Sequence, residues 1–378
     1  MFSVGVPQEI KTLEKRVGLT PEAVKELTRE KIEVFVEKNA GIKSGFSDTD
    51  YEKAGATVVG TNKELYARSQ IIQKVKEPLT AEFSFLRHDH ILFCFLHLAS
   101  QENCALTEVL MQSKCTAIGF ETLRVDGKIP LLAPMSQIAG GLSASYSAMI
   151  PSKSTIKNGK IHYEADFFHE MEQMASAYPH PYGNYRLGHV IIFGAGVAGK
   201  SACEAALQYG AKITFIEKND FTRKKLQSEG LTVFSPDDPR DAILKSADVL
   251  IGCAHVIGQR AGHVLSSSEL AKASKDKTKV IMDISIDQGG NFPESHSTNY
   301  SDSLYIDSWG NRRFAVPNIP SLAGKSTSIK ISEASLFYTR LLARHGVKAF
   351  EISKVLAEAI NVSTGKILID AIRKAHCS

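Results

Sequence analysis

The stretch Val190-Ile191-Ile192-Phe193-Gly194-Ala195-Gly196-Val197-Ala198-Gly199 decides the fold of this chain. An apolar, strand-like run leads directly into the pattern GxGxxG, and a helical sequence over residues 200–208 follows. Glycines at these positions allow a tight turn, a close approach of the backbone to a pyrophosphate, and close packing of the helix on the strand. The order of strand, glycines and helix predicts a dinucleotide-binding turn, with the phosphates at the helix N-terminus. The predicted cofactor contacts in this turn are Gly194, Ala195, Gly196, Val197, Ala198 and Gly199.

A carboxylate after the next predicted strand distinguishes between the two dinucleotides. Glu217 follows the apolar run 213–216, where it can accept hydrogen bonds from the adenosine ribose hydroxyls. The same negative charge repels a phosphate on that ribose. The sequence therefore predicts NAD rather than NADP as the cofactor. A tight strand-to-helix turn without a ligand is the plain alternative for the glycines taken alone.

The same letters also satisfy a second phosphate-binding pattern. Lys200 and Ser201 extend the turn, so that residues 194–201 read GxxxxGK[ST], the loop of P-loop NTPases. Asp283, at the end of a later apolar run, could then bind magnesium. This P-loop-like NTPase is the less favoured interpretation, because it gives Glu217 no function.

Length and composition indicate a globular protein of two domains. With 378 residues the chain exceeds the roughly 250 to 300 residues at which a single core stops growing. Hydrophobic residues make up 43% and charged residues 23%, which is ordinary for a folded protein. The net charge of +4 comes from bases and acids mixed along the chain, so no nucleic acid partner is expected. No signal peptide and no run of about 18 apolar residues occur, which favours a cytoplasmic protein without a membrane partner.

Short apolar runs alternate with helical stretches in both halves of the chain, as βαβ units do. The predicted fold class is therefore α/β in two domains. A Rossmann-type NAD-binding domain is expected over residues 131–309, and a discontinuous, Rossmann-like substrate (catalytic) domain over 1–130 and 310–378. Thr20-Pro21-Glu22 predicts a helix start in the latter. The polar segment 151–187 is interpreted as a crossover between the domains.

The tail of the chain is predicted to be an amphipathic helical segment, from about Asn318 onward. Its expected apolar face consists of Ala334, Leu336, Phe337, Leu341 and Leu342. Because such a face needs a partner, we expect the tail to return and pack on the first domain.

Several short segments, spread over most of the chain, occur in the same order as in one protein family. They are Val4–Lys11, Arg16–Pro21, Lys74–Pro78, Phe95–Ala99, Leu131–Ser136, the glycine turn and Asp283–Gly290. Together they resemble the alanine dehydrogenase and pyridine nucleotide transhydrogenase family, and most closely its alanine dehydrogenase branch. The resemblance implies a two-lobed fold and usually a homo-oligomer, a dimer or a hexamer. It also implies that L-alanine, NAD and water are converted reversibly into pyruvate, ammonia and NADH, with hydride transfer at C2.

The chemistry of that reaction suits four residues in these segments. A 2-oxo acid carries a carboxylate, for which Arg16 offers a bidentate cation, while Lys76 offers a compact charge near the carbonyl oxygen. His97 suits proton transfer near neutral pH, and Asp287 is expected to face it and to help bind ammonia or an imine. His97, Asp287 and Lys76 are thus the predicted catalytic residues, and Arg16 and Lys76 the predicted substrate-binding residues. Taken alone, His97 would more often be a hydrogen-bonded core residue, and Arg16 a solvated one.

Two more cofactor contacts rest on the resemblance. Ser136 is expected to contact the cofactor, or else to be a helix N-cap. Asn318 is expected to touch nicotinamide or substrate, or else to be an ordinary turn residue. No metal site is predicted, because His169-Glu170 begins an HExxH pattern but Gln173 stands where the second histidine belongs.

Some segments depart from the family pattern, so the sequence does not determine the identity of the substrate. Ser136–Gly141 lacks an acid and a base that the family has there, residues 163–185 replace a glycine-rich stretch, and Gly258–Gly262 replaces a Pro-Gly-Ala-Lys-Ala-Pro run. The alternative is a related oxidoreductase that acts on a different amino acid, a secondary amine or a cyclic imine. A transhydrogenase-type domain with a membrane partner and a non-catalytic nucleotide sensor are less favoured.

Overall fold

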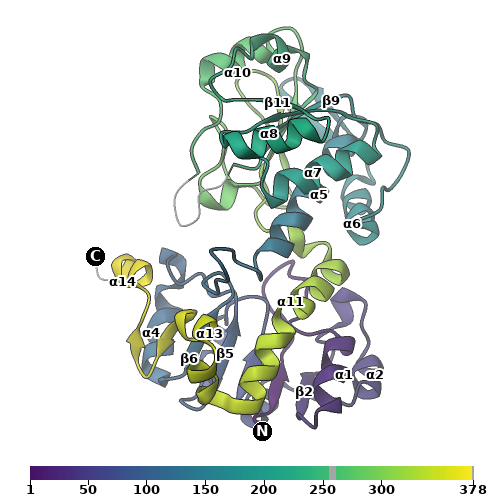
Figure 1. Cartoon of the computed structure of the whole chain (residues 1–378). Helices are drawn as coiled ribbons and strands as arrows, with labels where there is room; N and C mark the ends of the chain where they lie inside the picture. The colour runs from purple at the N-terminus through teal and green to yellow at the C-terminus, as the bar shows by residue number, and fades with distance from the viewer. Residues whose placement is uncertain (255–260, 377–378) are drawn as a thin grey trace. The chain divides into compact units, whose positions relative to one another are not determined.

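The computed structural model describes residues 1–254 and 261–376, which divide into two compact units (Figure 1). Unit 1 contains residues 1–134 and the chain from residue 321 onward, and unit 2 contains residues 135–320. Each unit is built on its own, mostly parallel sheet with connecting helices. The predicted α/β fold class with Rossmann-like sheets is therefore confirmed.

Unit 1 is built on an eight-stranded sheet in the order β3-β2-β1-β4-β5-β6-β16-β17. The first six strands of this order are parallel, and the last two pair antiparallel. This is the doubly wound order of Rossmann folds with an added hairpin at one edge. The strands are β1 Val4–Val6, β2 Val34–Glu37, β3 Thr57–Val59, β4 Ile71–Gln73, β5 Ile91–Cys94, β6 Thr116–Gly119, β16 Ile360–Ser363 and β17 Lys366–Ile367.

Helices connect these strands and bury their apolar sides against the sheet. They are α1 Pro21–Arg29, α2 Asp48–Lys53, α3 Asn62–Arg68, α4 Cys104–Ser113, α11 Gly324–His345, α12 Ala349–Ile352, α13 Lys354–Glu358 and α14 Asp370–His376. α1 begins at Pro21, as the sequence predicts, because proline fits the first turn and Thr20 precedes it in an extended conformation. Leu106 and Leu110 of α4 pack in one buried cluster with Leu92 of β5.

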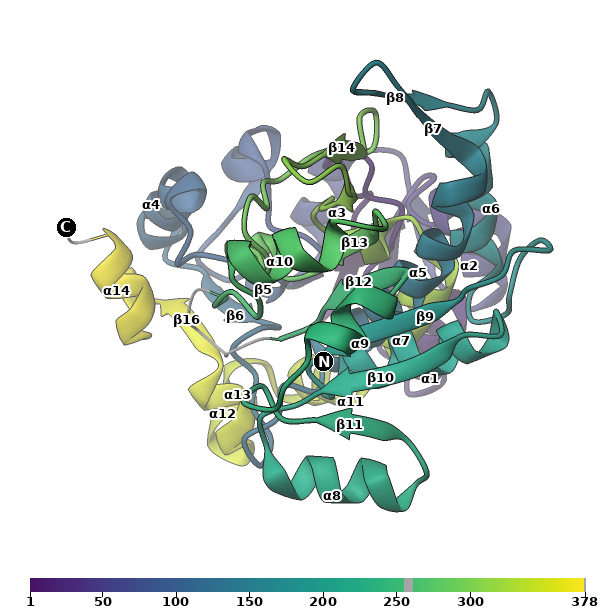
Figure 2. The same cartoon turned by 90° about the horizontal axis from the view of Figure 1, so that it is seen from above.

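Unit 2 contains a seven-stranded sheet in the order β11-β10-β9-β12-β13-β15-β14. All neighbours are parallel except β14 and β15, and Figure 2 shows β11, β10, β9 and β12 in succession. β9 is buried along its whole length, as a central parallel strand covered on both faces must be. The strands are β9 His189–Phe193, β10 Lys212–Ile216, β11 Thr232–Phe234, β12 Val249–Gly252, β13 Val280–Asp283, β14 Leu304–Ile306 and β15 Arg312–Phe314.

The helices of unit 2 include one long helix that begins at the unit boundary. They are α5 Ala133–Lys153, α6 Phe167–Ala177, α7 Val197–Gln208, α8 Asp220–Ser228, α9 Asp241–Ser246 and α10 Ser267–Ser274. Segment 151–187 does not form a crossover between the units, so that interpretation is wrong. It contains the hairpin of β7 Ser154–Lys157 and β8 Lys160–Tyr163, followed by α6, and it lies wholly within unit 2.

The boundaries of the units lie later in the chain than the boundaries expected from the sequence. Residues 310–320, expected in the substrate domain, belong to unit 2, and residues 131–134 belong to unit 1. The reason for the first difference is β15, which pairs with β13 on one side and β14 on the other. Backbone hydrogen bonds of the sheet therefore hold this segment in unit 2.

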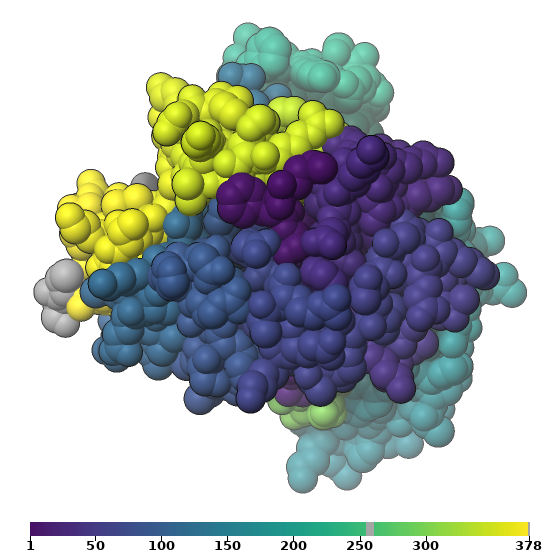
Figure 3. All heavy atoms as spheres, turned by 90° about the horizontal axis from the view of Figure 1, so that it is seen from below, coloured from purple at the N-terminus to yellow at the C-terminus, as the bar shows by residue number. Residues whose placement is uncertain are grey.

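The C-terminal segment belongs to unit 1, where Figure 3 shows it (yellow-green) beside the N-terminal residues (purple). The backbone N–H of Phe2 donates to the carbonyl oxygen of Ala343 at 2.7 Å. However, the apolar face expected for this helix is wrong. Phe337 is 61% exposed, and of the five side chains expected on that face only Leu342 is buried.

Small hydroxyl side chains form the buried face of α11 instead. Ser328 accepts a hydrogen bond from the backbone N–H of Val17 at 2.9 Å, and Ser335 accepts one from the Gln73 amide at 2.8 Å. Thr339 donates to the other end of the same amide at 2.5 Å. Because these side chains are short, the helix lies close to the unit 1 backbone, and hydrogen bonds satisfy the buried polar groups there.

Candidate functional site

In unit 2 the predicted cofactor residues gather at the carboxyl ends of parallel strands. The glycine turn follows β9, Glu217 follows β10, Asp287 lies beyond β13, and Asn318 lies beyond β15. Since these strands are parallel members of one sheet, the four positions share one edge. That edge is where doubly wound folds bind nucleotides.

The three glycines of the turn have different local roles. Gly194 has φ +94°, in the left-handed region that favours glycine. A Cβ added at Gly199 would lie 2.0 Å from the carbonyl oxygen of Gly194, so α7 can pack on the turn only if this residue is glycine. Among the described residues, a Cβ added at Gly196 would meet nothing within 4 Å. The protein's own backbone thus favours glycine at Gly194 and Gly199, whereas the space beside Gly196 is open. This arrangement suits a turn whose backbone approaches a pyrophosphate.

The carboxylate of Glu217 lies over this turn. Its Oε2 accepts a hydrogen bond from the backbone N–H of Ala195 at 2.7 Å, and its Oε1 accepts one from Asn219 at 2.8 Å. The register that pairs Phe193 with Ile216 puts the ends of the two strands level and so brings the acid to the turn. An acid held here can bind ribose hydroxyls and repels a ribose phosphate.

The side chains that a P-loop would need are used for other purposes. The hydroxyl of Ser201 is buried and lies 3.1 Å from the hydroxyl of Tyr178, while Lys200 is exposed on α7. Asp283 accepts a hydrogen bond from the backbone N–H of Asn291 at 2.7 Å and organises the loop after β13. These contacts favour the dinucleotide interpretation over the P-loop interpretation.

The other predicted residues of unit 2 occupy distinctive backbone positions. Asp287 lies in the 3₁₀ helix Ile286–Gln288, and its side chain is exposed. Asn318 has φ +56°, a left-handed conformation that asparagine tolerates better than most residues. Ser136 lies within the first turn of α5, which begins at Ala133, so the N-cap alternative for it is wrong.

In unit 1 the predicted substrate residues also gather at the carboxyl ends of parallel strands. Arg16 lies between β1 and α1, Lys76 follows β4, and His97 follows β5. The sheet places β1, β4, β5 and β6 side by side, so these positions share one edge. Glu121, which follows β6, lies at the same edge, and the sequence analysis missed it.

Arg16 is held in a fixed direction by a buried acid. The guanidinium is 2% exposed and pairs with Glu14 through two hydrogen bonds, Nε to Oε1 at 2.6 Å and Nη2 to Oε2 at 2.5 Å. Burial opposes the charge of Glu14, but Arg16 holds the pKa of that carboxyl below its ordinary value. A guanidinium held in this way is suited to recognise a carboxylate, because little rotamer freedom remains to be lost on binding.

The Lys76 ammonium lies 3.3 Å from Nε2 of His97. Desolvation and then the positive charge of Arg16 lower the pKa of Lys76. Desolvation and then Lys76 lower the pKa of His97. Although the imidazole of His97 reaches solvent, the positive charge of Lys76 at this distance by itself lowers the pKa of His97. The positive charge of Lys76 thus keeps His97 neutral, and a negative charge bound beside Lys76 would raise the proton affinity of the imidazole again.

A buried ionic cluster lies next to these residues in unit 1. The ammonium of Lys74 is 2.7 Å from the carboxylate of Glu82 and 3.7 Å from that of Glu9. Glu9 also accepts a hydrogen bond from the backbone N–H of Val75 at 2.6 Å. Of the two lysines in the segment Lys74–Pro78, Lys74 is buried in this cluster, and Lys76, the one predicted from the sequence, lies beside His97.

One departure from the family pattern has a local explanation. A Cβ added at Gly141 would lie 2.3 Å from the ring of Tyr178, so no larger side chain fits beside that ring. Tyr178 comes from segment 163–185, so two of the departing segments pack against each other at α5. Residues 258–260 of the third departure lie outside the described residues, while Ala261 and Gly262 fall within them.

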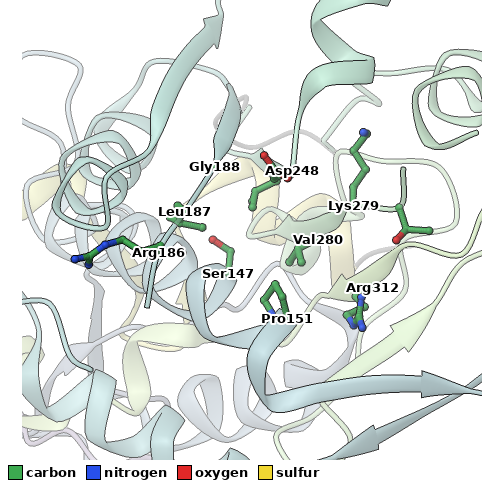
Figure 4. Close-up of a pocket in the computed structure, with 11 residues that line it drawn as sticks. Ser147, Pro151, Arg186, Leu187, Gly188, Asp248, Lys279, Val280 and Arg312 are labelled. Atoms are coloured by element: carbon green, nitrogen blue, oxygen red, sulfur yellow. The ribbon is translucent and has the colours of Figure 1, made fainter. Parts of the chain in front are cut away.

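A cavity of unit 2 lies away from the predicted residues. It has a volume of about 300 Å³ and is lined at the amino ends of β12, β13 and β15 by Val249, Val280 and Arg312. Figure 4 shows Ser147 and Pro151 of α5 among its walls, while the side chain of Arg186 extends away from them. The glycine turn lies at the opposite, carboxyl end of this sheet, so the cavity is not the predicted cofactor site.

Neither a metal-binding cluster nor a membrane-spanning helix is found in the described residues. In residues 1–254 and 261–376, no three His, Cys, Asp or Glu side chains are grouped so that they could hold a metal ion. Across the same ranges, no helix has the length and apolarity needed to cross a membrane.

Family models match both parts of the chain. The model described as "Alanine dehydrogenase/PNT, N-terminal domain" matches residues 5–139, and that described as "Alanine dehydrogenase/PNT, C-terminal domain" matches residues 165–370. Two similar curated proteins are both named alanine dehydrogenase. The protein from Methanococcus maripaludis is 32% identical, covering 99% of this chain and 96% of its own. The protein from Mycobacterium tuberculosis is 34% identical, covering 98% and 95%.

Solved structures agree with these similarities. A structure titled L-alanine dehydrogenase superimposes with a TM-score of 0.83 at 32% identity, covering 99% of this chain and 98% of its own. A transhydrogenase from Sinorhizobium meliloti superimposes with a TM-score of 0.75 at 18% identity, covering 97% and 99%. At that identity the second likeness concerns the fold alone.

Proposed function

The chain belongs to the alanine dehydrogenase/PNT family, and on that premise we propose that it is an NAD-dependent amino-acid dehydrogenase that interconverts L-alanine and pyruvate. The observation that carries the proposal is the grouping of Arg16, Lys76 and His97 at one sheet edge, with Lys76 3.3 Å from His97. A cation for a carboxylate, a second cation for a carbonyl oxygen, and a proton-transfer group are what a 2-oxo acid requires.

The residues at the carboxyl edge of the unit 2 sheet fit NAD. The open space at Gly196 supports a pyrophosphate site there, and the position of the Glu217 carboxylate beside the turn supports its assignment to the ribose hydroxyls. NAD held by these residues would supply the acceptor for a hydride from C2 of the amino acid, and NADH would supply the donor in the reverse direction. We assign Ser136 and Asn318 as further contacts, since both lie on this unit and Asn318 holds the left-handed backbone often found at functional positions.

Each catalytic residue has a separate task in this proposal. Arg16 binds the substrate carboxylate, and Lys76 holds the carbonyl oxygen by its positive charge. His97 is neutral, so its Nε2, which faces Lys76, takes up the proton released as water adds, and returns it in the reverse direction. Asp287 holds ammonia as ammonium, or the cationic imine, by its negative charge.

The experiment that tests this function follows NADH oxidation by the purified protein with pyruvate and an ammonium salt. We expect saturable turnover, with a kcat in the range of about 1 to 10³ s⁻¹ that is usual for enzymes, and none when ammonium is omitted. A protein that binds NADH but oxidises it with no 2-oxo acid would contradict the proposal.

The departures around α5 favour a second candidate of the same class. Tyr178 fills the space beside Gly141, where the family pattern carries a basic residue, so this chain lacks that base in the segment that begins at Ser136. A related enzyme would act on a different amino acid, a secondary amine or a cyclic imine. A panel of 2-oxo acids and cyclic imines separates the two, since kcat/KM is highest for pyruvate only under the first.

Glu217 is expected to determine the choice between NADH and NADPH. Replacing it with serine removes the charge that repels a ribose phosphate. It also removes the two oxygens that accept hydrogen bonds from the backbone N–H groups of Ala195 and Asn219, each with a further lone pair for a ribose hydroxyl. We predict that Glu217→Ser lowers the ratio of kcat/KM for NADH over NADPH by about tenfold or more, which corresponds to about 1.4 kcal/mol. Glu229→Ser, on an exposed position after α8, is the control. An unchanged ratio would remove Glu217 from the cofactor site.

We also propose that the chain assembles as a homo-oligomer, a dimer or a hexamer. Several apolar side chains of α11 and its neighbours remain exposed on unit 1, among them Phe337 at 61% and Val347 at 61%. Exposed apolar groups of this kind are often covered in an assembly. Light scattering at several concentrations would measure the molar mass, and a monomer throughout would contradict the proposal.

A further inference from the structure

The backbone of His97 adopts a conformation that histidine rarely adopts. Its φ is +48°, in the left-handed region, although the residue carries a Cβ and an aromatic ring. Such a conformation persists only where the surrounding structure imposes it. Something in unit 1 must therefore hold this residue.

Contacts on both sides of this peptide hold it. On the amide side, Oε1 of Glu121 accepts a hydrogen bond from the N–H of His97 at 2.7 Å, and both carboxylate oxygens lie 3.2 Å from the N–H of Leu96. On the carbonyl side, the amide of Asn103 donates to the carbonyl oxygens of Leu96 and His97, each at 3.2 Å. The backbone N–H of Ser100 also donates to the carbonyl oxygen of His97 at 3.0 Å.

We propose that Glu121 is a positioning residue for the reaction: its carboxylate holds the backbone of Leu96 and His97 and thereby directs the imidazole toward Lys76. The proposal rests on the proposed function in taking His97 as the acid/base. Glu121 makes its hydrogen bonds with the backbone and not with the ring, so it acts by geometry. A shift of one ångström in a reacting group can cost on the order of a hundredfold in rate.

A carboxylate suits this task better than an amide does. The N–H of His97 faces Oε1, and the N–H of Leu96 faces both oxygens, so an acceptor is required at both oxygen positions, which only a carboxylate offers. Burial raises the pKa of Glu121, while the bonds from the backbone N–H groups of His97 and Leu96 and the charge of Lys76 work in the opposite direction. In Glu121→Gln the side-chain amide group would face a backbone N–H of Leu96 or His97. Two donors cannot bond to each other, so at least one of the present hydrogen bonds would be lost.

The charged groups around the ring supply a readout that does not depend on turnover. Desolvation lowers the pKa of His97 most, and the positive charge of Lys76 lowers it further. The charge of Glu77 raises this pKa, and those of Lys11 and Arg16 lower it. If the ring moves away from Lys76, the largest of these charge effects weakens, and the pKa rises toward the ordinary value of a histidine. A residue that only stabilised the fold would change the melting temperature without raising this pKa, because the loss of its negative charge alone can only lower the pKa of a nearby histidine.

The experiment compares the wild type with Glu121→Gln and with Glu102→Gln, an exposed glutamate in the loop that follows His97. The imidazole of His97 is titrated by NMR in the protein without substrate, and kcat and the dissociation constant of NADH are measured in parallel. We expect Glu121→Gln to raise the pKa of His97 and to lower kcat about tenfold to a hundredfold, with NADH affinity unchanged within about twofold. Glu102→Gln should match the wild type in all three.

A wild-type pKa of His97 together with a wild-type kcat in Glu121→Gln would overturn the proposal. Should Glu121→Gln fail to fold, Asn103→Ala releases the carbonyl side of the same turn, and the same rise in pKa is expected. If no variant turns over any 2-oxo acid, the proposed function has failed, yet the NMR titration still decides whether Glu121 positions the ring.

Discussion

Replacing His97 with asparagine is expected to reduce kcat with pyruvate and ammonia by about 10² to 10⁴, the usual contribution of a general acid/base. This corresponds to about 3 to 5 kcal/mol of barrier. Asparagine is the better test than alanine, because it tolerates the left-handed backbone that His97 adopts at φ +48°. The loss then reports the missing imidazole and not a relaxed loop. Steady-state kinetics with saturating substrates measure the effect.

The control for this variant is His88→Asn, an exposed histidine of the same unit. NADH affinity, followed by fluorescence, should stay within about twofold of the wild type in both, because the predicted NADH contacts lie on other residues. Asp287→Ala should reduce turnover as His97→Asn does. Near-normal kcat in His97→Asn would mean that another group moves the proton, and the role proposed for His97 would have to be abandoned.

The second large effect is expected for Gly196→Ala, which should weaken NADH binding at least about tenfold while leaving thermal stability unchanged. The added Cβ meets no atom of residues 1–254 or 261–376 within 4 Å, so it costs the fold little. It projects instead into the space that the backbone turn leaves open for the pyrophosphate. Fluorescence titration with NADH and a melting curve measure the two quantities separately.

Two other glycines supply the contrast for this prediction. Gly199→Ala places its Cβ 2.0 Å from the carbonyl oxygen of Gly194, so it should destabilise the unit itself by about 1 to 3 kcal/mol or more. Gly60→Ala, far from the turn in unit 1 and also with nothing within 4 Å, should change neither quantity. Unaltered NADH affinity in Gly196→Ala would remove the glycine turn from the cofactor site.

The two helices with the most informative sequence patterns show where local reasoning succeeds and fails. α7 was predictable because the glycines that shape its start are adjacent in the chain and act through the backbone. α11 was predictable as a helix, but its buried face was not. Apolar periodicity indicated Phe337, whereas the face is buried through Ser328, Ser335 and Thr339. Periodicity measures transfer of apolar surface and cannot detect hydrogen bonds to a backbone far away in sequence.

The acids at the unit 1 site show the same limit. Arg16, Lys76 and His97 were recognisable because each lies in a short segment that resembles the family and each carries suitable chemistry. Glu14 and Glu121 carried no such signal, since an isolated glutamate is usually a solvated residue. Their roles follow from the contacts with Arg16 and with the backbone of His97.

Neighbouring residues in the chain were enough to predict the NAD-binding turn, the preference for NAD, and the alternation of strands and helices that gives two α/β units. These properties depend on glycine conformations, on strand-to-helix order and on charge, all of which operate over a few residues. Folding in three dimensions was needed to decide which acid meets which base, which face of α11 is buried, and to which unit residues 310–320 belong. Those outcomes depend on hydrogen bonds between strands and helices that lie far apart in sequence, and parallel pairing brings their ends together at one edge of a sheet.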